Sequence, residues 1–149
     1  MAESDEHKDA VKALSKKFNS ICELENFTQA DFVKWVDDNN DPFPIGEDRP
    51  KAKKPDFYAI SSKHKILIIG EAKTHWELNA NNYINEYSFN LRSKEQLESF
   101  LIFLEKKNQQ GFKTYIIYSV PLMTLPGFKK FLINNFDFNS CSLTIIVGD

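Results

Sequence analysis

Two acidic residues and a lysine stand at the ends of neighbouring apolar segments in the stretch KPDFYAISSKHKILIIGEAK, residues 54–73. Asp56 comes directly before the first segment, and Glu71 and Lys73 follow the buried-looking run ILII of the second. Carboxylate oxygens are hard ligands of the kind that Mg²⁺ takes in proteins. An amine beside them could orient a water molecule or neutralise charge on phosphorus. This combination predicts metal-assisted hydrolysis of a phosphodiester.

The segments DFYAI and KILIIGEAK are predicted to form a β-hairpin, because only the polar tetrapeptide SSKH joins them. Alternate residues of a strand share a face, so Glu71 and Lys73 point to the same side. If the turn is centred in SSKHK, Asp56 lies opposite Glu71; a register shifted by two places Ile69 there and leaves Glu71 one diagonal away. Like charges held about 5 Å apart repel, so both registers favour a divalent cation between the acids.

The pattern Pro55-Asp56, fourteen residues, Glu71-Ala72-Lys73 resembles the signature of the PD-(D/E)xK, or restriction-endonuclease-like, nucleases. The resemblance extends over roughly residues 5 to 120. It implies that Asp56 and Glu71 hold Mg²⁺ or Mn²⁺ together with the carbonyl of Ala72, and that Lys73 serves the nucleophilic water. The implied fold is a restriction-endonuclease-like core, and the implied activity is that of a metal-dependent deoxyribonuclease.

Further site residues follow from the same resemblance. Some members carry a QxxxY pattern on the next helix, and this chain has Gln96 with Phe100 in place of the tyrosine, so only the glutamine carries over. Alternatively, Gln96 belongs to a helix-capping box that opens at Ser93. Many members also use an upstream glutamate. The candidate here is Glu25, and its rivals are Glu23, Glu6 and Glu47.

A basic cluster precedes the first acid and could contact phosphates. Its members are Arg49, Lys51, Lys53 and Lys54. The formal net charge of the whole chain is −2, so nucleic acid would be bound through such a local patch. DNA is the expected substrate, with RNA or branched DNA as alternatives that need the same chemistry. A homodimer, which would bring two sites to two strands, is left open.

Length and composition predict one globular domain over residues 1–149. The 149 residues are 42% hydrophobic and 27% charged, which suffices for a core and is unlike a disordered chain. Cys22 and Cys141 show no CxxC spacing and are expected to be buried thiols in a reducing compartment. The longest apolar run is too short to span a bilayer, and residues 1–10 are charged, so a cytoplasmic location is expected.

The periodicity of apolar residues predicts the elements that position these side chains. Their order favours an α/β fold, a three-layer α/β/α sandwich with a central mixed sheet. The expected helices start at Ser4, with an end at or beyond Cys22 left open, and cover residues 27–39, 93–110 and 125–136. The expected strands cover residues 56–60, 65–73, 113–120 and 142–149, and residues 40–55 form a proline-rich loop.

A second class of function fits the same residues. The domain could be a catalytically silent module of the nuclease fold that binds nucleic acid or a protein partner. Glu71 and Lys73 would then be ordinary charges at a strand end, and Asp56 a turn residue after a proline. Metal-dependent cleavage of DNA distinguishes the two.

Overall fold

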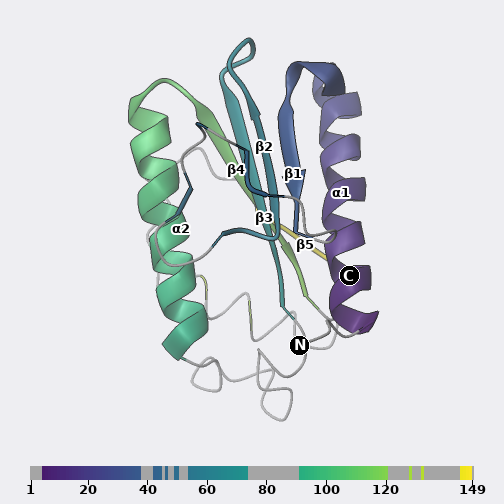
Figure 1. The fold of residues 1–149 in the computed structure, drawn as a ribbon, viewed down its shortest axis with the longest axis vertical. Helices are drawn as coiled ribbons and strands as arrows, with labels where there is room; N and C mark the ends of the chain where they lie inside the picture. The colour runs from purple at the N-terminus through teal and green to yellow at the C-terminus, as the bar shows by residue number, and fades with distance from the viewer. Residues whose placement is uncertain are drawn as a thin grey trace.

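A single mixed sheet forms the centre of the protein (Figure 1). The computed structural model describes residues 5–37, 42–44, 46, 49–50, 54–73, 91–120, 128, 132 and 145–148. Within them the sheet has five strands in the order β1-β2-β3-β4-β5. Neighbours are antiparallel from β1 to β3 and parallel from β3 to β5. The strands are β1 (Val33–Val36), β2 (Phe57–Ser61), β3 (Ile66–Ala72), β4 (Lys113–Ser119) and β5 (Ile145–Gly148).

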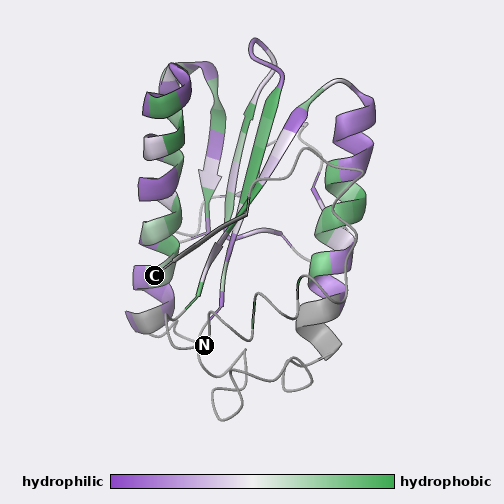
Figure 2. Cartoon of the chain, turned by 180° about the vertical axis from the view of Figure 1, so that it is seen from behind, coloured by the Kyte–Doolittle hydropathy of each residue, from purple (hydrophilic) through white to green (hydrophobic). Residues whose placement is uncertain are grey.

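Helix α1 (Asp5–Glu25) covers one face of the sheet. Its residues Val11, Leu14 and Phe18 recur at helical spacing and are completely buried. They belong to one apolar cluster with Phe57 of β2 and Ile68 of β3. Figure 2 shows that apolar residues line the sheet-facing sides of the helices and that polar residues line the outer sides.

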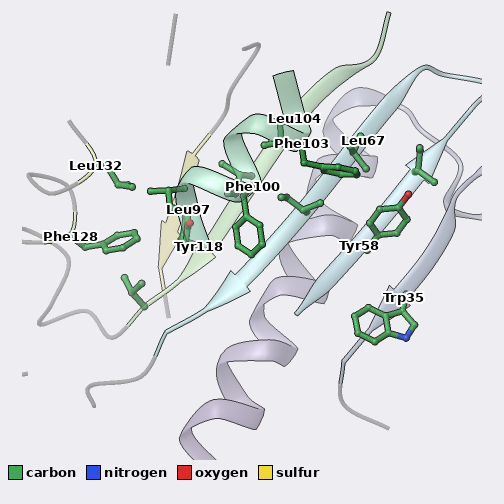
Figure 3. Packing of buried hydrophobic residues seen from close by; sticks show 14 residues of the cluster. Trp35, Tyr58, Leu67, Leu97, Phe100, Phe103, Leu104, Tyr118, Phe128 and Leu132 are labelled. Atoms are coloured by element: carbon green, nitrogen blue, oxygen red, sulfur yellow. The ribbon is translucent and has the colours of Figure 1, made fainter. Parts of the chain in front are cut away.

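Helix α2 (Leu91–Gln109) covers the opposite face, so the arrangement has three layers. Phe100 and Leu104 are completely buried and pack with Tyr58, Leu67 and Tyr118 (Figure 3). Because side chains alternate along each strand, β2 and β3 supply apolar residues to both clusters and are buried along their whole length. The α/β class with a mixed sheet between helices is therefore confirmed.

The end of α1, which the sequence left open, lies at Glu25. Asn26 follows with a φ of 58°, in the left-handed region that asparagine tolerates. The amide of Asn26 donates to the carbonyl of Glu23 at 3.4 Å, and that of Phe27 to the carbonyl of Cys22 at 2.9 Å. This pair of bonds is a Schellman motif, which satisfies carbonyls that the helix end would leave without partners. The expected burial of Cys22 is confirmed, and burial raises the pKa of its thiol.

The expected helix over residues 27–39 is wrong. A short 3-10 helix (Gln29–Asp31) leads instead into strand β1, which pairs antiparallel with β2. Phe32 belongs to the cluster under α1, whereas Trp35 belongs to the cluster under α2. Two residues three apart would share one side of a helix, but they occupy opposite faces of a strand. Pairing with β2 therefore overrides a helical spacing that these aromatic and β-branched residues only mimic.

The β2–β3 hairpin has the first of the two registers that the sequence predicted. Phe57 pairs with Gly70 and Ser61 with Ile66, around a turn over residues 62–65. Lys65 takes a left-handed φ of 57° to close the turn. The same register, continued one step beyond the Phe57–Gly70 pair, brings Asp56 opposite Glu71.

The remaining elements agree with the sequence where the structure describes them. Strands β4 and β5 lie within the expected ranges, and Gly111, just after α2, has a φ of 94°. In the expected helix over residues 125–136, Phe128 and Leu132 are described, and both are helical and buried. Cys141 lies outside the described residues. Among those that are described, no helix combines the length and apolar character needed to cross a membrane.

Substituting alanine at Gly70 should destabilise the protein by about 1–3 kcal/mol, because an added methyl group overpacks a fully buried site. A Cβ atom there would lie 3.1 Å from Cδ2 of Leu14 and 3.1 Å from Cβ of Phe57. Urea unfolding of Gly70→Ala measures the loss. The cost should be smaller in a Leu14→Ala background; an unchanged unfolding midpoint in Gly70→Ala would contradict the close approach of α1 to the sheet.

The hairpin turn is tied to the 3-10 helix by Asp31, whose Oδ2 lies 3.0 Å from Nε2 of His64 and 3.5 Å from Nζ of Lys63. The hydrogen bond with His64 is the main reason that the pKa of Asp31 is held below its ordinary 3.8. A carboxylate with a lowered pKa stabilises the fold above its unfolded pKa and ceases to do so as the pH falls through its folded pKa. Asp31→Asn should therefore melt below the wild type at neutral pH. The two melting temperatures should converge in acid, and a difference that persisted there would exclude this ion pair as the cause.

Candidate active site

Asp56 and Glu71 lie at the same end of the hairpin, and both side chains are buried, 3% and 0% exposed. Asp56 is fixed by a hydrogen bond across the two strands, in which the amide of Ala72 donates to its Oδ2 at 2.8 Å. The start of β2 is thus connected to the end of β3 through a carboxylate. A buried carboxylate that accepts a backbone N–H is stabilised in its charged form.

Lys73, directly after β3, neutralises part of this negative charge. Its Nζ lies 3.3 Å from Oε2 of Glu71, and the lysine is only 6% exposed. Its backbone amide donates to the carbonyl of Ser119 at 2.9 Å, which ties the residue to the end of β4. Two buried opposite charges in contact offset part of the desolvation cost that each would carry alone.

Gln96 of α2 is the second partner of Lys73. Its Oε1 accepts a hydrogen bond from Nζ of Lys73 at 2.5 Å, and the glutamine is 8% exposed. The capping-box alternative for Gln96 is wrong, because α2 begins at Leu91 and Ser93 lies inside the helix instead of at its N-cap. The structure therefore brings together Asp56, Glu71, Lys73 and Gln96, four residues that the sequence singled out.

His7 of α1 joins the site from the other face of the sheet. Its Nε2 lies 3.9 Å from Oδ1 of Asp56, the oxygen that does not bind the amide of Ala72. The sequence alone favours a solvated or capping histidine over one that touches the site. The available signal was its spacing, because His7 precedes the buried Val11 by four residues and so shares the sheet-facing side of the helix.

Tyr118 of β4 is a neighbour of Glu71 that the sequence did not indicate. The two residues are partners in the parallel pairing of β3 with β4, and Tyr118 is 3% exposed. Burial, and then the charge of Glu71, raise the pKa of the Tyr118 hydroxyl well above 10. The phenol therefore stays neutral and cannot add a further negative charge beside the two carboxylates.

Glu25, the proposed supporting acid, does not lie at this site. It is the last residue of α1 and is exposed, and it is near enough to Lys113 for their charges to interact. Lys113 pairs with Ile66 at the start of β3, whereas the site lies at the end of that strand. The reason is the unbroken helix, whose first turns carry His7 to the site and whose last turn ends at the opposite end of the sheet. Glu23 is exposed near the same helix end, and Glu47 and the side chain of Glu6 lie outside the described residues.

Half of the predicted basic cluster can be located. Arg49 and Lys54 are exposed, and Nζ of Lys54 lies 5.6 Å from the ring centroid of Trp35. Lys51 and Lys53 fall outside the described residues. Lys54 precedes Asp56 by two residues, so at least one basic side chain of the cluster lies close in sequence to the buried acids.

The donors at the site suit a hard divalent cation in type. Asp56 and Glu71 offer carboxylate oxygens from adjacent strand ends, and the carbonyl of Ala72 comes directly after Glu71 in the sequence. Mg²⁺ commonly takes only one or two protein carboxylates and keeps several waters. In the part of the chain that the structure describes, no group of three or more histidine, cysteine, aspartate or glutamate side chains is placed to hold a metal ion. The fit therefore rests on two carboxylates, the number that Mg²⁺ accepts.

No family model, curated protein or solved structure matches this chain. The function is therefore inferred from the geometry at the end of the hairpin and from the chemistry of the side chains there.

The hydrogen bond between Ala72 and Asp56 predicts different effects for two substitutions. Asp56→Ala leaves the buried amide of Ala72 without its acceptor, which should cost about 1–3 kcal/mol of stability. Asp56→Asn retains an acceptor oxygen and should lose less. Urea unfolding of both variants at neutral pH measures the difference. Equal stabilities of the two variants would show that this bond does not hold the strand ends together.

Proposed function

We propose that the protein hydrolyses phosphodiester bonds of DNA with Mg²⁺ or Mn²⁺, using Asp56, Glu71 and Lys73 on a restriction-endonuclease-like core. The observation that carries the proposal is the pair of buried carboxylates at adjacent strand ends, with the amine of Lys73 at 3.3 Å from Glu71. Burying like charges side by side costs stability and is a common property of sites that perform chemistry. A purely structural strand end has no need of them.

The order of elements supports the same proposal. The residues of the motif lie on an antiparallel hairpin that is followed by α2 and by the parallel strand β4, with α1 on the opposite face. This is the context that the resemblance to PD-(D/E)xK nucleases implies for its acidic and basic residues. Because only β2 and β3 supply the acids, the hairpin register determines the distance between them.

Each residue has a chemical role in this proposal. Asp56, Glu71 and the carbonyl of Ala72 would hold the cation, which supplies Lewis-acid stabilisation of the phosphate and a more acidic bound water. The amide of Ala72 donates to Oδ2 of Asp56, and the other carboxylate oxygen, Oδ1, lies 3.9 Å from Nε2 of His7. Lys73 offers an ammonium that can orient the attacking water or stabilise charge that develops on phosphorus.

Substrate binding would begin outside the buried acids. The exposed Arg49 and Lys54 precede Asp56 and can contact the phosphate backbone without reading sequence. Such contacts are equally open to RNA and branched DNA, so these substrates belong in the same assay. A homodimer with one site for each strand is part of the proposal only if double-stranded DNA is cut on both strands.

Incubation with plasmid and linear DNA in Mg²⁺, Mn²⁺ or EDTA tests the proposal directly. Cleavage should require the metal and should fall by at least about 100-fold in Asp56→Asn, Glu71→Gln and Lys73→Met. Glu98→Gln, an exposed position on α2, is the matched control and should cleave like the wild type.

Cleavage that persists in EDTA or in Asp56→Asn would refute this mechanism. Binding of DNA without turnover in any metal would instead favour the catalytically silent module. Thermal melting of each variant separates a loss of chemistry from a loss of fold.

A further inference from the structure

The ammonium of Lys73 has two partners that come from different layers of the protein. Its Nζ forms an ion pair with Oε2 of Glu71 on the sheet, at 3.3 Å, and donates a hydrogen bond to Oε1 of Gln96 on α2, at 2.5 Å. Glu71, Lys73 and Gln96 are all buried, with 0%, 6% and 8% of their surface exposed. A lysine has three N–H donors on a flexible four-carbon stem, so its head group can move between the two partners without losing both.

Glu71 carries a negative charge and Gln96 is neutral, and this difference affects metal binding. A divalent cation on Glu71 and the ammonium of Lys73 are both positive, and in a buried site their repulsion is weakly screened. The two cations therefore compete for the same carboxylate. A cation that binds Glu71 strongly must displace the ammonium by some distance.

A displaced ammonium must keep a partner, because an unpaired charge is costly to bury. Gln96 provides one that repels neither cation, since its amide oxygen is an uncharged acceptor. It also keeps the amine within the site, where its contact with Gln96 already exists. An apolar residue at this position would leave Glu71 as the acceptor on which Lys73 depends.

We propose that Gln96 is a positioning residue that acts through Lys73 and holds its ammonium when a divalent cation binds Glu71. The affinity of the site for the metal then depends on how the ammonium of Lys73 partitions between Glu71 and Gln96. The inference rests on the proposed function, because it requires Glu71 to bind the metal. It adds that Lys73 opposes metal binding while Gln96 assists it. Gln96 need not touch the substrate.

The two residues therefore have opposite expected effects on Mn²⁺ affinity, measured by titration calorimetry at one neutral pH. Lys73→Met should bind Mn²⁺ more tightly, by about tenfold, and Gln96→Leu more weakly, by about five- to tenfold, within the usual range of coupling between two sites. In the double variant the effect of Gln96→Leu should disappear, because the lysine through which it acts is gone. A merely structural role of Gln96 would weaken binding in both backgrounds.

Matched controls remove trivial causes. Lys17→Met deletes one positive charge from an exposed position of α1, and Glu98→Gln alters an exposed position of α2 close to Gln96. Neither should change Mn²⁺ affinity. Should Lys73→Met fail to fold, Lys73→Gln takes its place, because its side-chain amide keeps N–H donors without carrying charge.

The possible results separate this inference from the proposed function. If the wild type binds Mn²⁺ and cleaves DNA but Lys73→Met binds no more tightly, or Gln96→Leu still weakens binding in the double variant, the positioning role is wrong and the nuclease assignment stands. If the wild type neither binds Mn²⁺ nor cleaves DNA, both proposals are wrong.

Discussion

The hydrogen bond from the amide of Ala72 to the carboxylate of Asp56 is the contact on which the rest of the site depends. It joins the beginning of β2 to the end of β3, and it does so at the position where the hairpin register brings Asp56 opposite Glu71. Two buried acids at opposite positions of neighbouring strands are intrinsically unfavourable. The Ala72 amide and the Lys73 ammonium offset part of that cost, so the charges are stable only where the strand ends hold them together.

The two helices determine which further groups reach these acids. Gly70 allows α1 to approach the sheet so closely that Leu14 lies against the glycine, and the same helix delivers His7 to Asp56. On the other face, packing of Phe100 places α2 so that Gln96, one turn earlier, meets Lys73. Each helix thus contributes a polar side chain close to the apolar residues that pack the helix against the sheet. The apolar cores and the polar site are consequences of the same packing.

The error over residues 27–39 illustrates how a short segment can carry two patterns. Phe32, Val33 and Val36 fit one side of a helix, yet β-branched and aromatic residues also suit a strand. The open edge of β2 decided between helix and strand. Pairing with β1 satisfies backbone N–H and C=O groups of β2 that would otherwise need other partners. Local periodicity contains no information about such an edge, which exists only after the hairpin has formed.

The sequence by itself determined the hairpin and the placement of Asp56, Glu71 and Lys73 at one end, and it left two registers open, because strand alternation and a four-residue turn are local properties. It also indicated Gln96, but as one of two alternatives. Only the tertiary structure decided that Gln96 meets Lys73, that His7 reaches Asp56 and that Glu25 lies at the far end of the sheet. These relations depend on how a rigid helix lies across the sheet, and that position follows from the packing of the buried faces rather than from any spacing along the chain.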